Sequence, residues 1–221
     1  VGTKGTLKGV LPDEIENMNC PIILANTYHL EIQPGTKLID SLFGGLHNFM
    51  GGNCSSSGRK TKNSTDNTNK RRLYNLLTDS GGFQMVSLAS LSVVNEEGVV
   101  FQSPYTNETL LLRPEDSIRC QNDIGADIIM QLDDVISSVS VNEDRFRVAT
   151  LRTLRWYDRC VKAHRSPQTQ NLFPIMQGHL DVSKGGLREL CLAGFKHRDA
   201  QQRIPGFAIG GLAGGESKED F

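Results

Sequence analysis

Residues 75–83 read NLLTDSGGF, an apolar run that ends in an aspartate, a serine and two glycines. Four other segments have this design: PIILANTYHL at 21–30, ADIIMQLDD at 126–134, NLFPIMQG at 171–178 and GFAIGGLAGG at 206–215. Apolar runs without strict alternation are typical of strands that are covered on both faces, as in a parallel sheet. We therefore predict five buried parallel strands, each with polar or glycine residues at its carboxyl end.

Amphipathic stretches between these runs predict helices. Ser140 and Glu143 have the spacing of a capping box, and apolar or small residues then recur on one helix face, at Phe146, Thr150, Leu154, Tyr157 and Val161. Arginines lie largely off that face and predict a surface helix with a solvated basic side: Arg145, Arg147, Arg152, Arg155 and Arg159. Pro114, followed by two acids, predicts the start of another helix.

Repeated alternation of strand and helix predicts the α/β class. Because polar residues gather at the strand C-termini, a TIM-type (β/α)8 barrel is the favoured architecture, incomplete at the C-terminus in this chain. We predict a partial barrel over residues 1–221. Residues 51–72, GGNCSSSGRKTKNSTDNTNKRR, lack periodicity and predict a flexible polar insertion on the face opposite the strand tips. Two interpretations of its basic residues stay open: they could bind RNA, or they could belong to a solvated linker.

Composition sets outer bounds. The chain has 221 residues, 38% of them hydrophobic, and a net charge of −1, which indicates a globular protein without overall attraction to polyanions. No apolar stretch approaches the roughly 20 residues of a membrane span, and the N-terminal segment lacks the apolar region of a signal peptide. We expect no membrane insertion and a cytoplasmic location, with peripheral association with mitochondria left open. The scattered cysteines are expected to be buried structural thiols.

The polar ends of the strands would share one mouth in a barrel: Asn26, Tyr28, His29, Asp79, Ser80, Asp133, Asp134, Gln177, Gly210, Gly211, Leu212, Ala213, Gly214 and Gly215. Carboxylates, an amide and glycine backbone suit a planar hydrogen-bonding ligand such as a purine-like base. Other interpretations stay open at this point. Asp79 could cap a turn, His29 could be a core histidine, and Asp79, Asp133 and Asp134 could form the metal site of a hydrolase.

Longer motifs carry a resemblance. ILANTYHL with QPG, LLTDSGGFQ, the QSP-Y region, ADIIMQLDD, PIMQG and AIGGLAGGES follow one another over nearly the whole chain. In this order and spacing the sequence resembles the tRNA-guanine transglycosylase family, and within it the eukaryotic catalytic subunits. The family is a (β/α)8 barrel that replaces the wobble guanine of certain tRNAs with a modified deazaguanine. The resemblance implies a pentosyltransferase that acts on tRNA.

The resemblance also implies roles for the first group of strand-tip residues. Asp79 is similar to the general acid/base of the family, next to the base with Ser80, Gly81 and Gly82. Phe83 falls where an aromatic residue stacks on the base.

A second group is implied to read the base edges. Asp133 matches the carboxylate that binds the guanine-type edge, and Gln177 matches the amide on the carbonyl side. Gly211 and Leu212 match backbone contacts of the family. Gly214 stands where bacterial relatives usually carry valine, which makes room for the larger queuine as the incoming base.

The resemblance implies partners and absences too. The partners would be tRNA with guanine at the wobble position, queuine or guanine, and a related non-catalytic subunit in a heterodimer. The family's nucleophilic aspartate and its structural zinc ligands would lie beyond Phe221, so we expect no cofactor and no metal within this chain, and no turnover by it alone. The alternative is a non-catalytic fragment or a partner-type subunit that binds base or tRNA without turnover.

Overall fold

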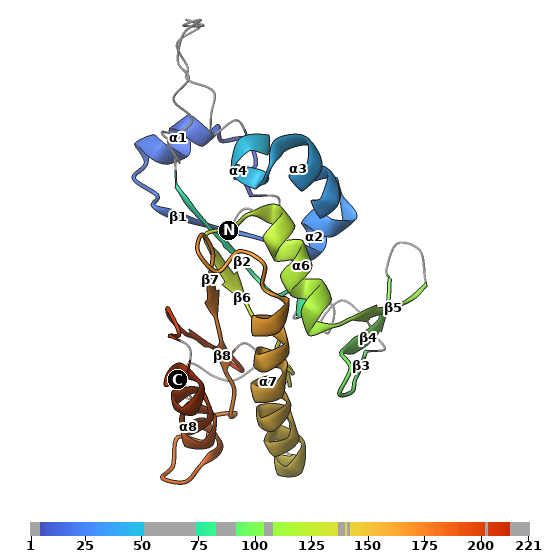
Figure 1. Ribbon diagram of the computed structural model, residues 1–221, viewed down its shortest axis with the longest axis vertical. Helices are drawn as coiled ribbons and strands as arrows, with labels where there is room; N and C mark the ends of the chain where they lie inside the picture. Colours follow the sequence, from blue (N-terminus) through green and yellow to red (C-terminus); the bar gives the residue numbers. More distant parts are fainter. Residues whose placement is uncertain are drawn as a thin grey trace, which may run out of the picture.

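The computed structural model describes residues 5–50, 74–82, 92–103, 108–136, 140, 142–201 and 203–212. Its helices are α1 (Pro12–Asn17), α2 (Thr27–Ile32), α3 (Thr36–Phe43), α4 (Leu46–Phe49), α6 (Pro114–Ile124), α7 (Glu143–Ala163) and α8 (Leu187–Asp199). Its strands are β1 (Ile22–Ala25), β2 (Asn75–Thr78), β3 (Val93–Val94), β4 (Val99–Gln102), β5 (Thr109–Leu112), β6 (Ile128–Met130), β7 (Asn171–Phe173), β8 (Ile175–Met176) and β9 (Ala208–Ile209) (Figure 1). The predicted α/β class is confirmed, while the predicted insertion at 51–72 lies outside the described residues.

The predicted strands pair in parallel and in chain order. One sheet has the order β1-β2-β6-β7, and β8 pairs with β9 in parallel. Pro174 separates β7 from β8, since it has no N–H to donate to a ladder. Gln131 spans this break, because its side-chain Oε1 accepts a hydrogen bond of 3.1 Å from the backbone N–H of Ile175. β7 and β8 are thus two parts of one strand, and the described parallel strands form an open run from β1 to β9.

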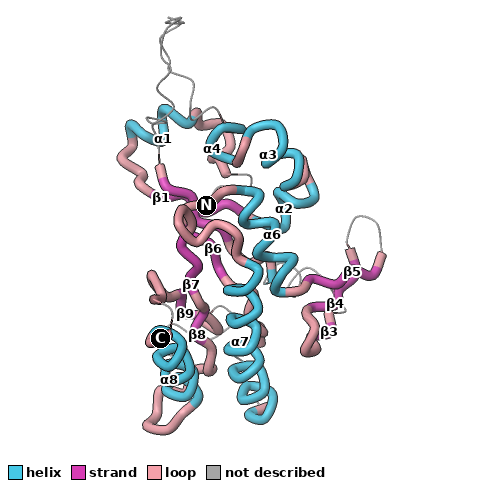
Figure 2. The backbone as a smooth tube through the Cα atoms, in the orientation of Figure 1, coloured by secondary structure: helices cyan, strands magenta, loops and turns pink. Residues whose placement is uncertain are grey.

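The helices form a layer that follows the same order as the strands. α3 packs on α6, α6 on α7 and α7 on α8, and Figure 2 shows α6, α7 and α8 as successive helical segments beside the strands. Right-handed crossovers between neighbouring parallel strands place every helix on the same side of a sheet that keeps advancing in one direction. This is the local arrangement from which a barrel is built.

The core lies between these two layers. Leu76 and Ile129 of the sheet, together with Ile118, Leu154 and Phe195 of the helices, are buried in one cluster. Gln121 of α6 is also fully buried, and its Oε1 accepts hydrogen bonds from Thr78 Oγ1 and from the backbone N–H of Met130. Its Nε2 donates to Met130 O at 2.7 Å. This satisfied amide fixes α6 against β2 and β6 without an unpaired polar group.

An antiparallel sheet, β3-β4-β5, extends from the side of the parallel layer and is absent from our prediction (Figure 1). Asn95 shapes the turn between β3 and β4, because its Oδ1 accepts from the N–H groups of Glu97 and Gly98. A Cβ on Gly98 would lie 2.2 Å from Leu112 O, so only glycine allows β4 to approach β5 this closely. The signal was two valine pairs on either side of Asn-Glu-Glu-Gly, a hairpin pattern.

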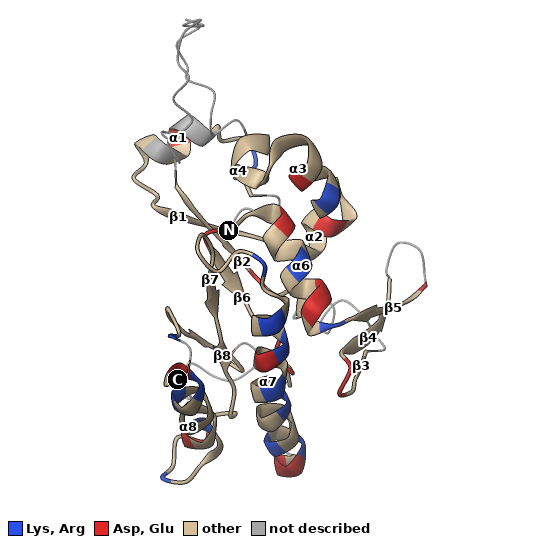
Figure 3. Cartoon of the chain, viewed as in Figure 1, with Lys and Arg blue, Asp and Glu red and all other residues tan. Residues whose placement is uncertain are grey.

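Two details of the predicted helix around residue 150 need correction. α7 begins at Glu143, and its N-cap is Asn142, whose side chain accepts from Arg145 N, whereas Ser140 was the predicted cap. The predicted apolar face is buried, apart from Val161, which is partly buried. The predicted basic side is solvated only in part, at the exposed Arg147 and Arg155. Figure 3 shows the basic residues that recur along α7, and four of its arginines form ion pairs with acids of neighbouring segments: Arg145, Arg152, Arg155 and Arg159.

Other expectations concern cysteines and membranes. Cys120, Cys160 and Cys191 are buried and free, as predicted, whereas Cys20 is only partly buried and Cys54 lies outside the described residues. Burial raises the pKa of Cys120 and of Cys160 to about 12. These thiols therefore stay protonated and act as small apolar side chains. In the described part of the chain, every helix is too short or too polar to cross a bilayer.

Candidate functional site

Asp79 lies directly after β2 and is held by the segment that follows β1. Its Oδ2 accepts a hydrogen bond of 2.7 Å from Asn26 Nδ2, and its Oδ1 accepts one of 2.9 Å from the backbone N–H of Thr27. Asn26 is also the N-cap of α2, since its Oδ1 accepts from His29 N. The start of α2 therefore fixes the orientation of a partly exposed carboxylate.

The residues after Asp79 turn tightly against the end of β6. Gly81 has a φ of +79°, a conformation that favours glycine. A Cβ on Gly82 would lie 2.8 Å from Leu132 Cδ1, so the turn approaches the residue before Asp133 closely. Ser80 is buried, and its carbonyl accepts from Ser117 Oγ of α6. The serine and the glycines thus bring the tip of β2 next to the tip of β6.

Asp133 and Gln177 meet in the interior at the ends of β6 and β8. Gln177 Nε2 donates to Asp133 Oδ2 at 2.5 Å, and both side chains belong to residues that are only 5% exposed. Burial raises the pKa of Asp133 to about 6, the bond from Gln177 opposes this rise, and the charge of Asp134 adds to it. Buried carboxylates with a pKa shifted toward neutrality are common in ligand-binding sites.

The glycines after β9 complete this group. A Cβ on Gly210 would lie 2.8 Å from Gln177 Nε2 and 3.5 Å from Asp133 Oδ2. A Cβ on Gly211 would lie 3.0 Å from Gln177 Oε1, and its φ of +71° again favours glycine. Backbone without a side chain therefore lies directly beside the carboxylate and the amide, and no Cβ fills the space between them.

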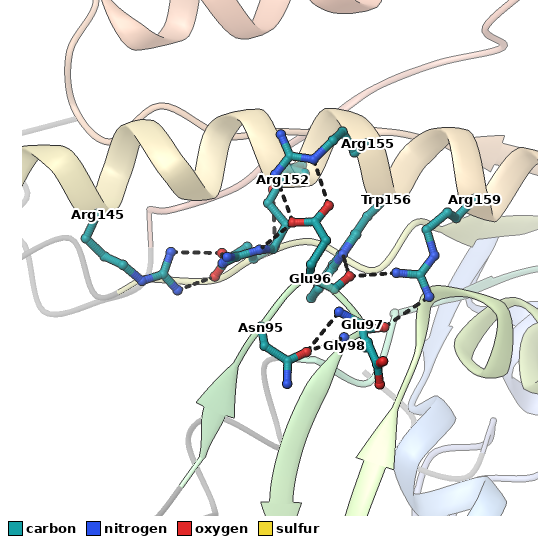
Figure 4. A network of polar contacts seen from close by, with 11 residues as sticks. Asn95, Glu96, Glu97, Gly98, Arg145, Arg152, Arg155, Trp156 and Arg159 are labelled. Atoms are coloured by element: carbon teal, nitrogen blue, oxygen red, sulfur yellow. Dashed lines mark hydrogen bonds and ion pairs between the residues drawn. The ribbon is translucent and has the colours of Figure 1, made fainter.

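Asp134 has a different environment from its neighbour. Its side chain is fully buried, and two guanidinium groups bind it, Arg145 at 2.8 and 2.5 Å and Arg152 at 2.5 Å. Figure 4 shows these arginines on α7, with Arg152 and Arg155 also turned toward Glu96 of the β3–β4 turn. Positive charge already occupies Asp134, which argues against a metal ion there. Among the described residues, no cluster of three His, Cys, Asp or Glu side chains suits a metal.

The strand-tip residues of the prediction thus fall into three groups. The structure brings Asp133, Gln177, Gly210 and Gly211 together, with the Asp79–Gly82 turn beside them across Leu132. Tyr28 and His29 lie on α2 instead of at a strand end, and Tyr28 is buried against Phe101 of β4. Phe83 and Gly214 lie outside the described residues, while Leu212 is the last described residue.

Sequence reasoning missed three arginines around this group. Arg145 and Arg152 neutralise Asp134, and Arg188 of α8 bonds the backbone at the ends of β8 and β9. The spacing of Arg145 and Arg152, one heptad apart, placed them on one helix face, but nothing in the sequence identified Asp134 as their partner. The cluster of Asp133, Gln177, Gly210 and Gly211 combines a carboxylate acceptor, an amide and main-chain groups, and it lies beside Asp79. This combination fits a planar heterocycle with adjacent N–H donors.

Comparison with known proteins adds independent findings. The model of the family described as queuine tRNA-ribosyltransferase matches residues 1–221. Two curated relatives named "Queuine tRNA-ribosyltransferase catalytic subunit" are 45% identical (Schizosaccharomyces pombe) and 43% identical (Caenorhabditis elegans) over 221 residues. A "Queuine tRNA-ribosyltransferase" of Synechococcus elongatus is 39% identical over 223 residues. In each case all of this chain is covered, and the chain spans about half the length of the relative, 48% to 50%.

Proposed function

Because this chain belongs to the queuine tRNA-ribosyltransferase family, we propose that the full-length protein replaces a guanine base in tRNA with queuine, in the cytoplasm. The observation that carries this proposal is the buried pair Asp133 and Gln177 beside the glycine backbone at Gly210 and Gly211. An ionised Asp133 would accept hydrogen bonds from the ring N1–H and the exocyclic amine of a guanine-type base. The amide and backbone would bind its carbonyl side.

Asp79 is proposed to be the general acid/base of the exchange. Asn26 and Thr27 hold both of its carboxylate oxygens, so the group is oriented before a base binds. Base exchange at an anomeric carbon needs a nucleophile that holds the ribose while one base leaves and another enters. Asp133 is committed to the base edge and Asp134 to two arginines. We therefore propose that a carboxylate outside the described residues attacks C1′.

A (β/α)8 barrel is the architecture we propose for the full-length protein. The parallel strands advance in one direction with a helix layer on one side, as the units of a barrel do. Ile209 of β9 is 69% exposed and Phe207 before it is 42% exposed, which is unusual for a strand in the interior of an α/β sheet. Further strands beside β9 would cover both side chains.

We also propose a heterodimer with a related non-catalytic subunit, because two relatives are named as catalytic subunits. An exposed apolar surface on α3 and α4 supports a protein partner: Leu38, Leu42, Phe43 and Phe49. Leu42→Glu should weaken a complex with the co-expressed partner in size-exclusion chromatography. Lys37→Glu, five residues earlier on the same helix, is the matched control. Equal complex formation by both variants would refute this surface.

The test of function is incorporation of labelled guanine or queuine into unmodified tRNA by the full-length protein. Asp79→Asn should abolish incorporation while base binding persists, since the asparagine keeps the size of the side chain but cannot transfer a proton. A wild-type protein that binds base and tRNA without incorporation would support the alternative, a binding subunit without turnover. The relatives' names and the oriented Asp79 do not favour that alternative.

A further inference from the structure

Arg188 bonds three backbone carbonyls at the ends of two neighbouring strands. Its Nε donates to His179 O at 2.7 Å, its Nη1 to Met176 O at 2.7 Å and its Nη2 to Gly210 O at 2.8 Å. Met176 is the last residue of β8 and directly precedes Gln177, while His179 lies two residues after Gln177. Gly210 directly follows β9. The planar fork of one guanidinium group therefore spans the two strand tips that carry the amide and the glycine backbone of the site.

The position of Arg188 is unusual for an arginine. It is half-buried, and in the part of the chain that the structure describes it forms no ion pair with a carboxylate. Burial lowers the pKa of Arg188. Arg198, near the other end of α8, is an ordinary structural arginine: it binds the Asp158 carboxylate through two hydrogen bonds of 2.6 Å. The N–H groups of Arg188 thus bind main-chain carbonyls, and each of these hydrogen bonds fixes the direction in which its carbonyl points.

The bond to Gly210 decides which way one peptide group faces. In a trans peptide the C=O and the following N–H point in opposite directions. Because Gly210 O is turned to Arg188, the N–H of Gly211 points away from α8. A Cβ built on Gly211 would lie 3.0 Å from Gln177 Oε1, so the side-chain amide of Gln177 lies directly beside Gly211. The N–H of Gly210 is meanwhile occupied by Met176 O at 2.9 Å.

We infer that Arg188 is a positioning residue for base recognition: it fixes the Gly210–Gly211 peptide so that the Gly211 N–H, together with the second N–H of Gln177 Nε2, donates to the carbonyl oxygen of the base. The inference rests on the proposed function, since it concerns the same site. It assigns to α8 a role in specificity without contact to the base. Loss of the fork would free the peptide to rotate and would affect the carbonyl side of the base, while the carboxylate side stays bound by Asp133.

The test compares the affinity of the full-length protein for guanine and for 6-thioguanine by calorimetry. The two bases share the N1–H and the exocyclic amine, but sulfur is a much weaker acceptor than oxygen. Wild type should prefer guanine, and Arg188→Met should reduce that preference roughly tenfold, the value of one well-placed hydrogen bond. Arg188→Lys keeps the charge without the fork and should fall between them. Arg198→Met, the matched control on α8, should keep the wild-type preference.

The preference is a ratio of two affinities, so partial unfolding of a variant does not change it. An unchanged ratio in Arg188→Met would overturn the inference, and so would a wild-type protein that binds both bases equally. A wild-type protein that binds neither base would instead refute the proposed function. A reduced ratio in Arg188→Met with a normal ratio in Arg198→Met supports the assignment.

Discussion

Gln177 and Asp133, 44 positions apart in the sequence, share a hydrogen bond of 2.5 Å between Gln177 Nε2 and Asp133 Oδ2. The amide thereby stabilises the charged form of a carboxylate whose pKa burial raises to about 6. The charge of its neighbour Asp134 raises this pKa further, and a backbone hydrogen bond lowers it. The protonation of Asp133 is therefore set by buried surroundings.

Base affinity should depend on pH through Asp133. The carboxylate accepts from two base donors only when it is ionised, so affinity for guanine should rise between about pH 5 and pH 7. Gln177→Ala removes the bond that lowers the pKa of Asp133, so the midpoint of this rise should move to higher pH. Calorimetric titrations over this range measure both midpoints. A flat profile in wild type would contradict the assignment of Asp133.

Asp133→Asn should weaken base binding more than Gln177→Ala. Asparagine places an amide donor against one of the two base donors, and charge-assisted hydrogen bonds are each worth roughly 1.5 to 3 kcal/mol. At a pH high enough to ionise Asp133 in every variant that keeps it, Gln177→Ala removes one neutral contact with the base and leaves the charged carboxylate in place. Equal losses of guanine affinity, or a larger loss in Gln177→Ala, would show that Asp133 is not the main recognition group.

Asp133 should also lower stability at neutral pH. The pKa of this acid is higher in the folded state, about 6, than the ordinary 3.8, so the folded protein binds more protons between these values. Stability is then lost as pH rises from about 4 to 6, by on the order of 3 kcal/mol. Asp133→Asn should remove this loss. Urea unfolding at pH 4 and pH 7.5 should show the variant gaining on wild type at the higher pH, unlike Asp40→Asn on the exposed side of α3.

Arg152 should matter far more for stability than Arg155. Both arginines bind the exposed Glu96, but Arg152 also binds the fully buried Asp134. Arg152→Met leaves that buried charge with one guanidinium instead of two and should cost about 3 kcal/mol. Arg155→Met breaks only an exposed pair and should cost about 1 kcal/mol or less. Urea unfolding gives both values.

A double variant separates charge from packing at this position. If the cost of Arg152→Met arises from the buried carboxylate, Asp134→Asn in the same chain should recover part of it. Similar costs for Arg152→Met and Arg155→Met, or no recovery in the double variant, would mean that the Asp134 pair contributes little.

Local sequence patterns predicted the parts of the structure that depend on nearby residues. The apolar runs predicted the parallel strands, and Pro114 with Glu115 and Asp116 predicted the start of α6. The residues at the strand ends could be grouped in advance because parallel strands bring their carboxyl ends to one edge. The predicted cap Ser140 was wrong because Asn142 offers the same chemistry two residues later.

Contacts between distant residues could not be predicted in this way. The arginines of α7 have the spacing of a solvated face, and only the fold brings Glu96 and Asp134 to them. Arg188 gave no signal either, because its partners are main-chain carbonyls, which every residue carries. The roles of Asp79, Phe83 and Gly214 in base exchange stay predictions.

The parallel strands follow one another in space as they do along the chain, from β1 to β9. Each strand and helix unit therefore makes its main contacts with the units just before and after it, as in a modular array. Among the described parallel strands, taking β7 and β8 as parts of one strand, the open edges belong to β1 and β9. A strand added at either edge would therefore extend the parallel sheet without passing through the existing layers.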